Sequence, residues 1–243
     1  MDFTDYRNRV YKKYASEFQG AKPIFDEMAA DIWGRAYDHY LRGWLPDRKD
    51  ATIVDVACGA GKLLHFFKKR GYVNFCGVDI SPEQVQLAGQ VIEKVTEANA
   101  IDFLEGHKFE FDLITGLDII EHFNKNEVLR FLDACYKALK PGGRLILQTP
   151  NAESPWVSSV RYGDFSHEVC FNPNGITRIL TLCGFSKIEP REQGPVVHGL
   201  LSTGRFVCWL CIRTGLKLWN LAETGTIGSG IFTRVFIIKG EKG

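Results

Sequence analysis

The chain has 243 residues, of which 45% are hydrophobic and 24% are charged, and its formal net charge is +1. This length suits one α/β domain with additions, and the near-neutral charge excludes a protein held on nucleic acid by a broad basic surface. The seven cysteines are odd in number, and several fall in predicted helices or strands, so we expect no disulfide framework.

The first residues of the chain, MDFTDYRNRVYKK, contain no apolar signal core. No apolar run reaches the ~18 residues of a membrane-spanning helix. We therefore expect a cytoplasmic protein.

Residues 1–50 carry aromatic and apolar side chains at helical spacing, which predicts two or three helices ahead of a sheet. Two roles remain open for this N-terminal helical cap. It covers one edge of the sheet, or it brings Tyr11, Tyr14 or Tyr37 over a bound cofactor or acceptor, since pockets in such folds often borrow from terminal helices.

The stretch TIVDVACGAGKLL, residues 52–64, predicts a strand, a turn and a helix. Ile53, Val54 and Val56 form a short β-branched run that is typical of a buried parallel strand. The turn that follows consists of small residues, which let a ligand approach the backbone closely, and the free N–H groups of the next helix favour an anion.

A second landmark, Asp79, ends the next predicted strand, 20 positions after Gly59. In αβ nucleotide sites a carboxylate at this spacing binds ribose hydroxyls, so turn and carboxylate together predict a cofactor that contains a nucleoside. The dinucleotide fingerprint finds Leu64 in place of its last glycine, and the phosphate-binding P-loop finds Val56 and Leu63 at two required positions. Both phosphate interpretations therefore fail.

The segment Asp55-Val56-Ala57-Cys58-Gly59-Ala60-Gly61 resembles the first motif of class I S-adenosylmethionine-dependent methyltransferases, D-x-G-C-G-x-G. Ala57 replaces the first glycine, from which we expect a small loss of room rather than a dead site. The resemblance implies an α/β, Rossmann-like sheet of seven strands in the order 3-2-1-4-5-7-6, with the last strand antiparallel. It also implies S-adenosylmethionine as the cofactor, held by Asp55, Ala57, Cys58, Gly59, Gly61, Asp79 and Ile80.

We expect a weak third strand around residues 98–103. In the methyltransferase pattern the adenine amino group is met just after this strand, which implies Asn99 and Ala100, with Asp102 as the alternative if the register differs.

The fourth strand and its exit, FDLITGLDIIEHF at 111–123, match the same family pattern. The resemblance implies that Leu117 and Asp118 contact the methionine end of the cofactor. Asp118, Glu121 and His122 follow the end of the strand, where open α/β sheets bind ligands. Glu121 and His122 are structural groups, a general base, or part of a divalent-ion site, since ubiquinone-pathway O-methyltransferases show a similar Asp-x-x-Glu-His run. We assign no metal ligand at this stage.

Residues 127–139 predict a helix that KPGG ends, and RLILQTPN predicts the fifth strand. A long connection follows, to about residue 171, and contains YGDFSHE. Loops of this length at strand ends are usually substrate loops, so His167 is a candidate to take a proton from an acceptor hydroxyl. Its alternative role is a hydrogen bond to a backbone carbonyl.

An insertion at residues 194–229 separates the last two strands and has helical character. We favour a helical lid packed on the domain, and the alternative is an amphipathic element whose residues 194–221 rest on the membrane inner face. Glycines at 204 and 215 argue against one long helix. Residues 51–243 would then form the methyltransferase domain.

We expect an enzyme that O-methylates a sugar or lipid-linked glycan precursor, with Glu121, His122 and His167 as the catalytic candidates. The sugar assignment follows from a resemblance to methyltransferases of surface-polysaccharide assembly. A quinone- or catechol-ring O-methyltransferase is the alternative enzyme, and a non-catalytic scaffold on the same fold is the alternative of another class. Nucleic acid is not an expected partner, and the sequence leaves the oligomeric state open.

Overall fold

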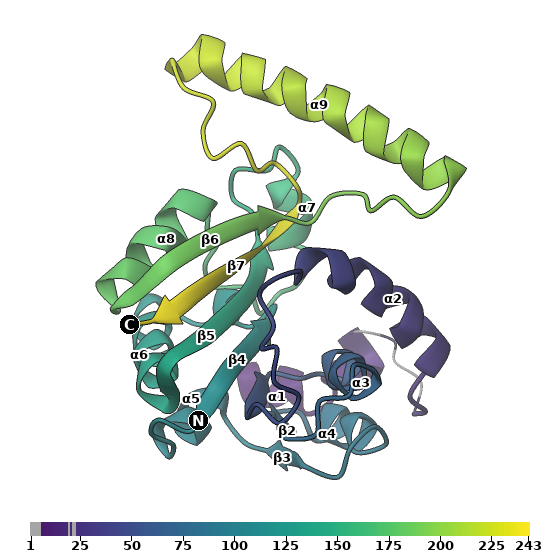
Figure 1. Ribbon diagram of the computed structural model, residues 1–243, viewed down its shortest axis with the longest axis vertical. Helices are drawn as coiled ribbons and strands as arrows, with labels where there is room; N and C mark the ends of the chain where they lie inside the picture. Colours follow the sequence, from purple (N-terminus) through teal and green to yellow (C-terminus); the bar gives the residue numbers. More distant parts are fainter. Residues whose placement is uncertain (1–5, 19, 21–22) are drawn as a thin grey trace.

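The computed structural model describes residues 6–18, 20 and 23–243, and shows a twisted sheet with helices on both faces (Figure 1). The strands lie in the order β3-β2-β1-β4-β5-β7-β6, and β7 is antiparallel to both of its neighbours. This confirms the predicted Rossmann-like topology. The strands are β1 (Ile53–Val56), β2 (Phe75–Asp79), β3 (Val95–Glu97), β4 (Phe111–Leu117), β5 (Leu139–Pro150), β6 (Phe185–Glu192) and β7 (Val235–Lys242).

The helices are α1 (Tyr6–Tyr11), the π-helical η1 (Tyr14–Phe18), α2 (Glu27–Tyr40), α3 (Lys62–Lys69), α4 (Pro82–Ala88), α5 (Ala100–Glu105), the 3₁₀ turn η2 (Ile120–His122), α6 (Lys125–Ala138), α7 (Val157–Arg161), α8 (Pro173–Leu182) and α9 (Leu200–Thr224). One apolar core lies between the sheet and α5, α6 and α8. A second core joins α2, α3 and the end of α4 to the other face. The two cores hold the strand ends in fixed positions.

The central strand β1 explains why the sheet forms here. All four of its residues, IVDV, are buried, and β1 pairs in parallel with β2 and β4. Fully burying a Val or Ile side chain is worth about 1.5–3 kcal/mol, so these apolar residues anchor the strand in the middle of the sheet. Asp55 is the exception, and it lies where the strand approaches its ligand-binding end.

The predicted third strand at 98–103 is wrong. The strand is β3, residues 95–97, and residues 100–105 form α5 instead. Asn99 caps this helix, because its side-chain oxygen accepts hydrogen bonds from the backbone N–H groups of Ile101 and Asp102. The cap residue outweighed the strand-like apolar character of Ile101 and Phe103.

The N-terminal region is helical, as predicted for residues 1–50, although residues 1–5 lie outside the described part of the chain. Helix α2 packs on α3. The second core includes Tyr37 of α2 and, just after this helix, Leu41 and Trp44. The cap is therefore continuous with the sheet rather than a separate unit.

The insertion differs from the predicted packed lid. Helix α9 is one continuous helix of 25 residues that includes Gly204 and Gly215, and it stands away from the sheet (Figure 1). Ser202 is its only buried residue. Arg213 and Trp209 hold the helix to the body through Glu192 on β6. Glycine costs a helix only about 1 kcal/mol, which flanking residues can offset.

Within the described residues, no helix combines the length and the apolar character needed to cross a bilayer. All seven cysteines are free in the structure.

Candidate functional site

A cavity of about 990 Å³ opens at the carboxyl ends of the parallel strands. The N-terminal helices close one side of it, and the segment from residue 159 to residue 167 closes another. The cavity brings together thirteen of the fourteen site residues that the sequence suggested. These are Asp55, Ala57, Cys58, Gly59, Asp79, Ile80, Asn99, Ala100, Leu117, Asp118, Glu121, His122 and His167.

The turn after β1 adopts left-handed backbone conformations at several of its small residues. Ala57, Gly59 and Gly61 all have positive φ, at 54°, 53° and 86°. A Cβ at Gly59 would have only Gln84 Oε1 within reach, at 4.0 Å, so the space beside Gly59 belongs to the cavity. A Cβ at Gly61 would instead lie 3.1 Å from Ala88 Cα. Gly61 therefore permits close packing against α4, and its role in holding the cofactor stays a prediction.

Asp79 connects the turn to the end of β2. Its Oδ2 accepts a hydrogen bond from the Gly59 N–H at 2.8 Å, and its Oδ1 accepts one from the Ser81 N–H at 2.8 Å. Burial raises the pKa of Asp79, and these backbone N–H groups partly offset that effect. Each carboxylate oxygen keeps a second lone pair, so Asp79 can still accept hydrogen bonds from a ligand.

The neighbouring Asp55 is fully buried and accepts a hydrogen bond from Thr115 Oγ1 at 2.7 Å. Burial raises the pKa of Asp55 to about 7, and the Thr115 bond opposes the shift. Burial also raises the pKa of the Cys58 thiol, so this cysteine is a small apolar wall and not a nucleophile.

This half of the cavity fits an adenosyl group. There is open space at Gly59, a carboxylate at Asp79 that can bind ribose hydroxyls, and an exposed apolar side chain at Ile80. Asn99 and Ala100 line the same region, whereas Asp102 pairs with Arg130 outside it. The structure therefore favours Asn99 and Ala100 over the alternative Asp102 for contact with the adenine.

At the other end of the cavity, Glu121, His122 and His167 come together. A possible ligand atom from each lies within 4.8 Å of the other two. Glu121 is fully buried, and neither of its carboxylate oxygens has a hydrogen bond of normal geometry. Burial, and then the charge of Asp118, raises the pKa of Glu121 well above its usual value.

Hydrogen bonds orient the two imidazoles. Ser166 Oγ donates to Asp164 Oδ1, so it accepts from His122 Nδ1 at 2.9 Å. His167 Nδ1 lies 3.2 Å from the carbonyl oxygen of Arg161 and must donate to it. These partners place both protons on Nδ1 and leave both Nε2 atoms with a lone pair.

His122 is a weaker base than an ordinary histidine. Burial, followed by the neighbouring His167, lowers the pKa of His122 to about 4. His122 is therefore a neutral imidazole and a weak base at pH 7, which suits a ligand or a hydrogen-bond acceptor better than a general base.

Asp118 lies between the two halves of the cavity. Its backbone φ is 55°, the residue lines the cavity, and its Oδ2 accepts a hydrogen bond from Gln148 Nε2 at 2.6 Å. Desolvation raises the pKa of Asp118, and the Gln148 bond opposes the shift. Gln148 also accepts a hydrogen bond from the Tyr37 hydroxyl, so α2 and β5 position Asp118 together.

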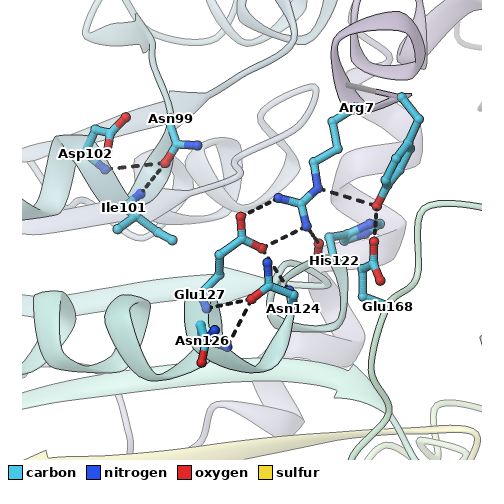
Figure 2. A network of polar contacts seen from close by, with 10 residues as sticks. Arg7, Asn99, Ile101, Asp102, His122, Asn124, Asn126, Glu127 and Glu168 are labelled. Atoms are coloured by element: carbon cyan, nitrogen blue, oxygen red, sulfur yellow. Dashed lines mark hydrogen bonds and ion pairs between the residues drawn. The ribbon is translucent and has the colours of Figure 1, made fainter. Parts of the chain in front are cut away.

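Arg7 connects helix α1 to the segment that carries His122 (Figure 2). Its guanidinium donates to both carboxylate oxygens of Glu127, at 2.6 and 2.8 Å, and to the carbonyl oxygen of His122 at 2.9 Å. A bidentate pair of this kind fixes orientation as well as distance. It holds α1 over the cavity, where Tyr11 and Tyr14 form part of the wall.

Sequence reasoning missed Gln148, Asp164 and Ser166. Gln148 had a usable signal, because it is a polar residue that directly follows the apolar run Leu145-Ile146-Leu147 near the end of β5. Asp164 and Ser166 lie in the loop singled out for His167, but nothing in that loop showed that they face His122. The expectation that Tyr11, Tyr14 or Tyr37 borders the site agrees with the cavity lining.

Comparison with known proteins agrees with a site for an adenosyl cofactor. A family model described as a methyltransferase domain matches residues 28–189. A ubiquinone biosynthesis O-methyltransferase from Hydrogenovibrio crunogenus is 30% identical over 109 residues, which are 42% of this chain and 44% of that protein. A small RNA 2'-O-methyltransferase from Mus musculus is 26% identical over 146 residues, 53% of this chain and 37% of that protein. The chain thus matches about half the length, or less, of these curated relatives.

Among solved structures, an S-adenosylmethionine-dependent methyltransferase from Archaeoglobus fulgidus superposes with a TM-score of 0.65 at 19% identity. The superposition covers 94% of this chain and 98% of that one. At this identity the likeness supports the fold.

Proposed function

Because the chain belongs to the methyltransferase domain family, whose class I members use S-adenosylmethionine, we propose that it methylates a hydroxyl oxygen of a sugar or lipid-linked glycan precursor. One observation carries the hydroxyl assignment: a single cavity joins the Asp79 end to the cluster of Glu121, His122 and His167. Methylation of a hydroxyl requires loss of its proton, and this cluster supplies groups that can accept or stabilise one.

The bound cofactor would supply a sulfonium methyl group, which is already strongly electrophilic. The protein's task is then to hold the acceptor oxygen in line and to remove its proton. Asp79, Gly59 and Asn99 would hold the adenosine part, and Leu117 and Asp118 the methionine end. We assign proton removal to His167, because the Arg161 carbonyl oxygen accepts its Nδ1 proton and so leaves Nε2 as the proton acceptor, whereas the low pKa of His122 makes it a weak base.

A divalent cation at the same cluster is the second interpretation. The donor set fits, since the buried carboxylate oxygens of Glu121 have no hydrogen bond of normal geometry and His122 and His167 each offer a ligand atom within 4.8 Å. A cation there would neutralise Glu121 and lower the pKa of a hydroxyl bound beside it. Mixed carboxylate and imidazole donors suit Mn²⁺ or Zn²⁺ better than Mg²⁺.

Calorimetric titration of the metal-free protein with Mn²⁺, Zn²⁺ and Mg²⁺ separates the two interpretations. Binding that Glu121→Gln abolishes, together with methyl transfer that stops in EDTA and returns with the metal, would support the cation. Full activity in EDTA would leave His167 as the base.

The acceptor itself is tested by release of S-adenosylhomocysteine with two panels, nucleotide sugars and catechols. We expect turnover with the sugars. Turnover confined to catechols would replace the sugar by a quinone-type ring, the acceptor class that the name of the Hydrogenovibrio relative suggests.

We also propose that the outer face of α9 rests on a membrane surface. Its apolar side chains are strongly exposed: Leu200 is 94% exposed, Leu201 89%, Leu218 62% and Trp219 70%. An interfacial helix has such a face, with cations on the other side, and Arg205 and Lys217 supply these. Sedimentation with anionic vesicles tests this, and we expect Leu201→Ser/Trp219→Ser to lose binding. Dimerisation through α9 without vesicle binding would contradict it.

A further inference from the structure

A second cavity, of about 700 Å³, lies between α2, the segment 193–198, the first half of α9 and the residues just before β7. Its charge is unusual. Arg35, Arg205 and Arg234 line it, and no Asp or Glu does. The three arginines come from segments far apart in the sequence, so the fold, and not a local basic run, brings them to one cavity.

The charges of these guanidinium groups are not neutralised by acidic side chains of the described residues. In the described parts of the chain, none of the three side chains has a hydrogen bond or ion pair with an acid. Nearby arginines behave differently: Arg191 pairs with Glu189, and Arg213 pairs with Glu192. Glu192 thus has a partner already and also accepts from Trp209, so it is not free to neutralise the cavity.

Aromatic rings complete the walls. Tyr40, Trp156 and Trp209 line the cavity, and the Trp156 side chain is 44% exposed. Tyr40 is held by its hydroxyl, which donates to the Gly194 carbonyl at 2.7 Å. Arginines with aromatic faces beside them are suited to a phosphate that carries a ring or an apolar chain.

The second cavity adjoins the first. Val235 lines both cavities, and Gln193 of the second donates to Gln148 of the first at 2.6 Å. The rings of Tyr37 and Tyr40, one from each lining, meet edge to face at 5.6 Å. A molecule lying across this boundary would place one end near Asp118 and the other among the arginines.

We propose that the arginine-lined cavity binds a phosphate or diphosphate group of the acceptor, which makes the substrate a phosphorylated or diphosphate-linked hydroxyl compound. This rests on the proposed methyl transfer to a hydroxyl. Arginine binds phosphate oxygens in a bidentate manner, and three arginines match the charge of a diphosphate. A nucleoside or a lipid can carry this group, and both present the same chemistry to the arginines.

The experiment is a calorimetric titration of the full chain with sodium pyrophosphate in the presence of saturating S-adenosylhomocysteine. Bound S-adenosylhomocysteine occupies the cofactor end of the first cavity, and its own binding tests the proposed function separately. We expect pyrophosphate to bind, each of Arg35→Gln, Arg205→Gln and Arg234→Gln to weaken it about tenfold, and the triple variant to lose it. Arg178→Gln, an exposed arginine on α8 outside this cavity, is the matched control and should bind normally.

Two further ligands identify the source of the diphosphate. UDP-glucose carries it on a nucleoside, and farnesyl diphosphate carries it on an isoprenoid chain. Tighter binding of either one than of pyrophosphate, lost in the triple variant, supports the proposal and names the source. Absence of pyrophosphate binding at millimolar concentration, or equal binding by the triple variant, overturns it. If S-adenosylhomocysteine itself fails to bind, the proposed function fails instead.

Discussion

The two ends of the main cavity are built in different ways. At the Asp79 end, the functional groups lie on consecutive strand tips, and backbone N–H groups fix them, as in the bond from Gly59 to Asp79. At the His167 end, side chains from remote segments hold one another, as in the bond from Tyr14 to Asp164, 150 positions away. The difference teaches that the first end depends on local chain geometry and the second on the assembled tertiary structure.

This contrast predicts that changes at one end leave the other intact. The largest effect should come from His167→Ala. We expect kcat for methyl transfer to fall by about 10²–10³, because a positioned base contributes on that scale, while S-adenosylmethionine affinity stays within about twofold. Turnover assays and calorimetry measure the two quantities. Equal losses in both would show that His167 supports the whole cavity and does not act on the acceptor.

The converse change is Asp79→Ala. It removes the carboxylate that orders the glycine turn and can bind ribose hydroxyls, so we expect cofactor affinity to fall about 100-fold. Pyrophosphate binding should be unchanged, since Asp79 does not line the arginine cavity. Calorimetry with both ligands tests the contrast directly. Unchanged cofactor affinity would remove Asp79 from the binding site.

Asp55 sharpens the comparison through pH. Its folded pKa is about 7, above the value of 3.8 expected when unfolded, so the folded state holds the extra proton between these limits. Stability from this group is therefore present at low pH and is lost as pH rises toward 7. In the native protein this group lowers the free energy of unfolding by up to about 1.4 kcal/mol for each unit of pH increase, and we expect Asp55→Asn to remove this dependence. Denaturant titrations at pH 5 and 8 measure the free energy of unfolding of both proteins. An equal change between the two pH values in the native protein and in Asp55→Asn would contradict the prediction.

The same contrast explains what the sequence could predict. Gly59, in the turn after β1, and Asp79, at the end of β2, are 20 positions apart, so their spacing indicated a shared site, and the family resemblance added Asp55. His167 was singled out from a loop, but its companions Asp164 and Ser166, and the link from Tyr37 to Gln148, depend on distant contacts that no local pattern encodes. The arginine-lined cavity could not be predicted for the same reason, since its three arginines come from distant segments of the chain.

Two local errors have local causes. The strand predicted at 98–103 is wrong because Asn99 caps a helix there, whereas the sequence analysis interpreted Asn99 only as a contact to the adenine. The insertion was predicted to pack on the domain because apolar helical faces are usually buried. In α9 that face stays exposed, and only tertiary structure could show it.

The smallest expected effect concerns Ala57, where the strained turn meets the family pattern. Its φ of 54° is left-handed, which costs a residue with a side chain about 1–2 kcal/mol, so glycine would remove the strain. Glycine also adds about 0.5–1 kcal/mol of unfolded-chain entropy, which offsets part of the gain. We therefore expect Ala57→Gly to raise stability by under about 1 kcal/mol, and to tighten cofactor binding slightly because the turn gains room. Denaturant midpoints and calorimetry measure these changes, with Ala60→Gly as the control in the same turn, at a position without positive φ. A clear loss of stability in Ala57→Gly alone would show that the alanine methyl group packs usefully and that the departure from the family motif carries no strain.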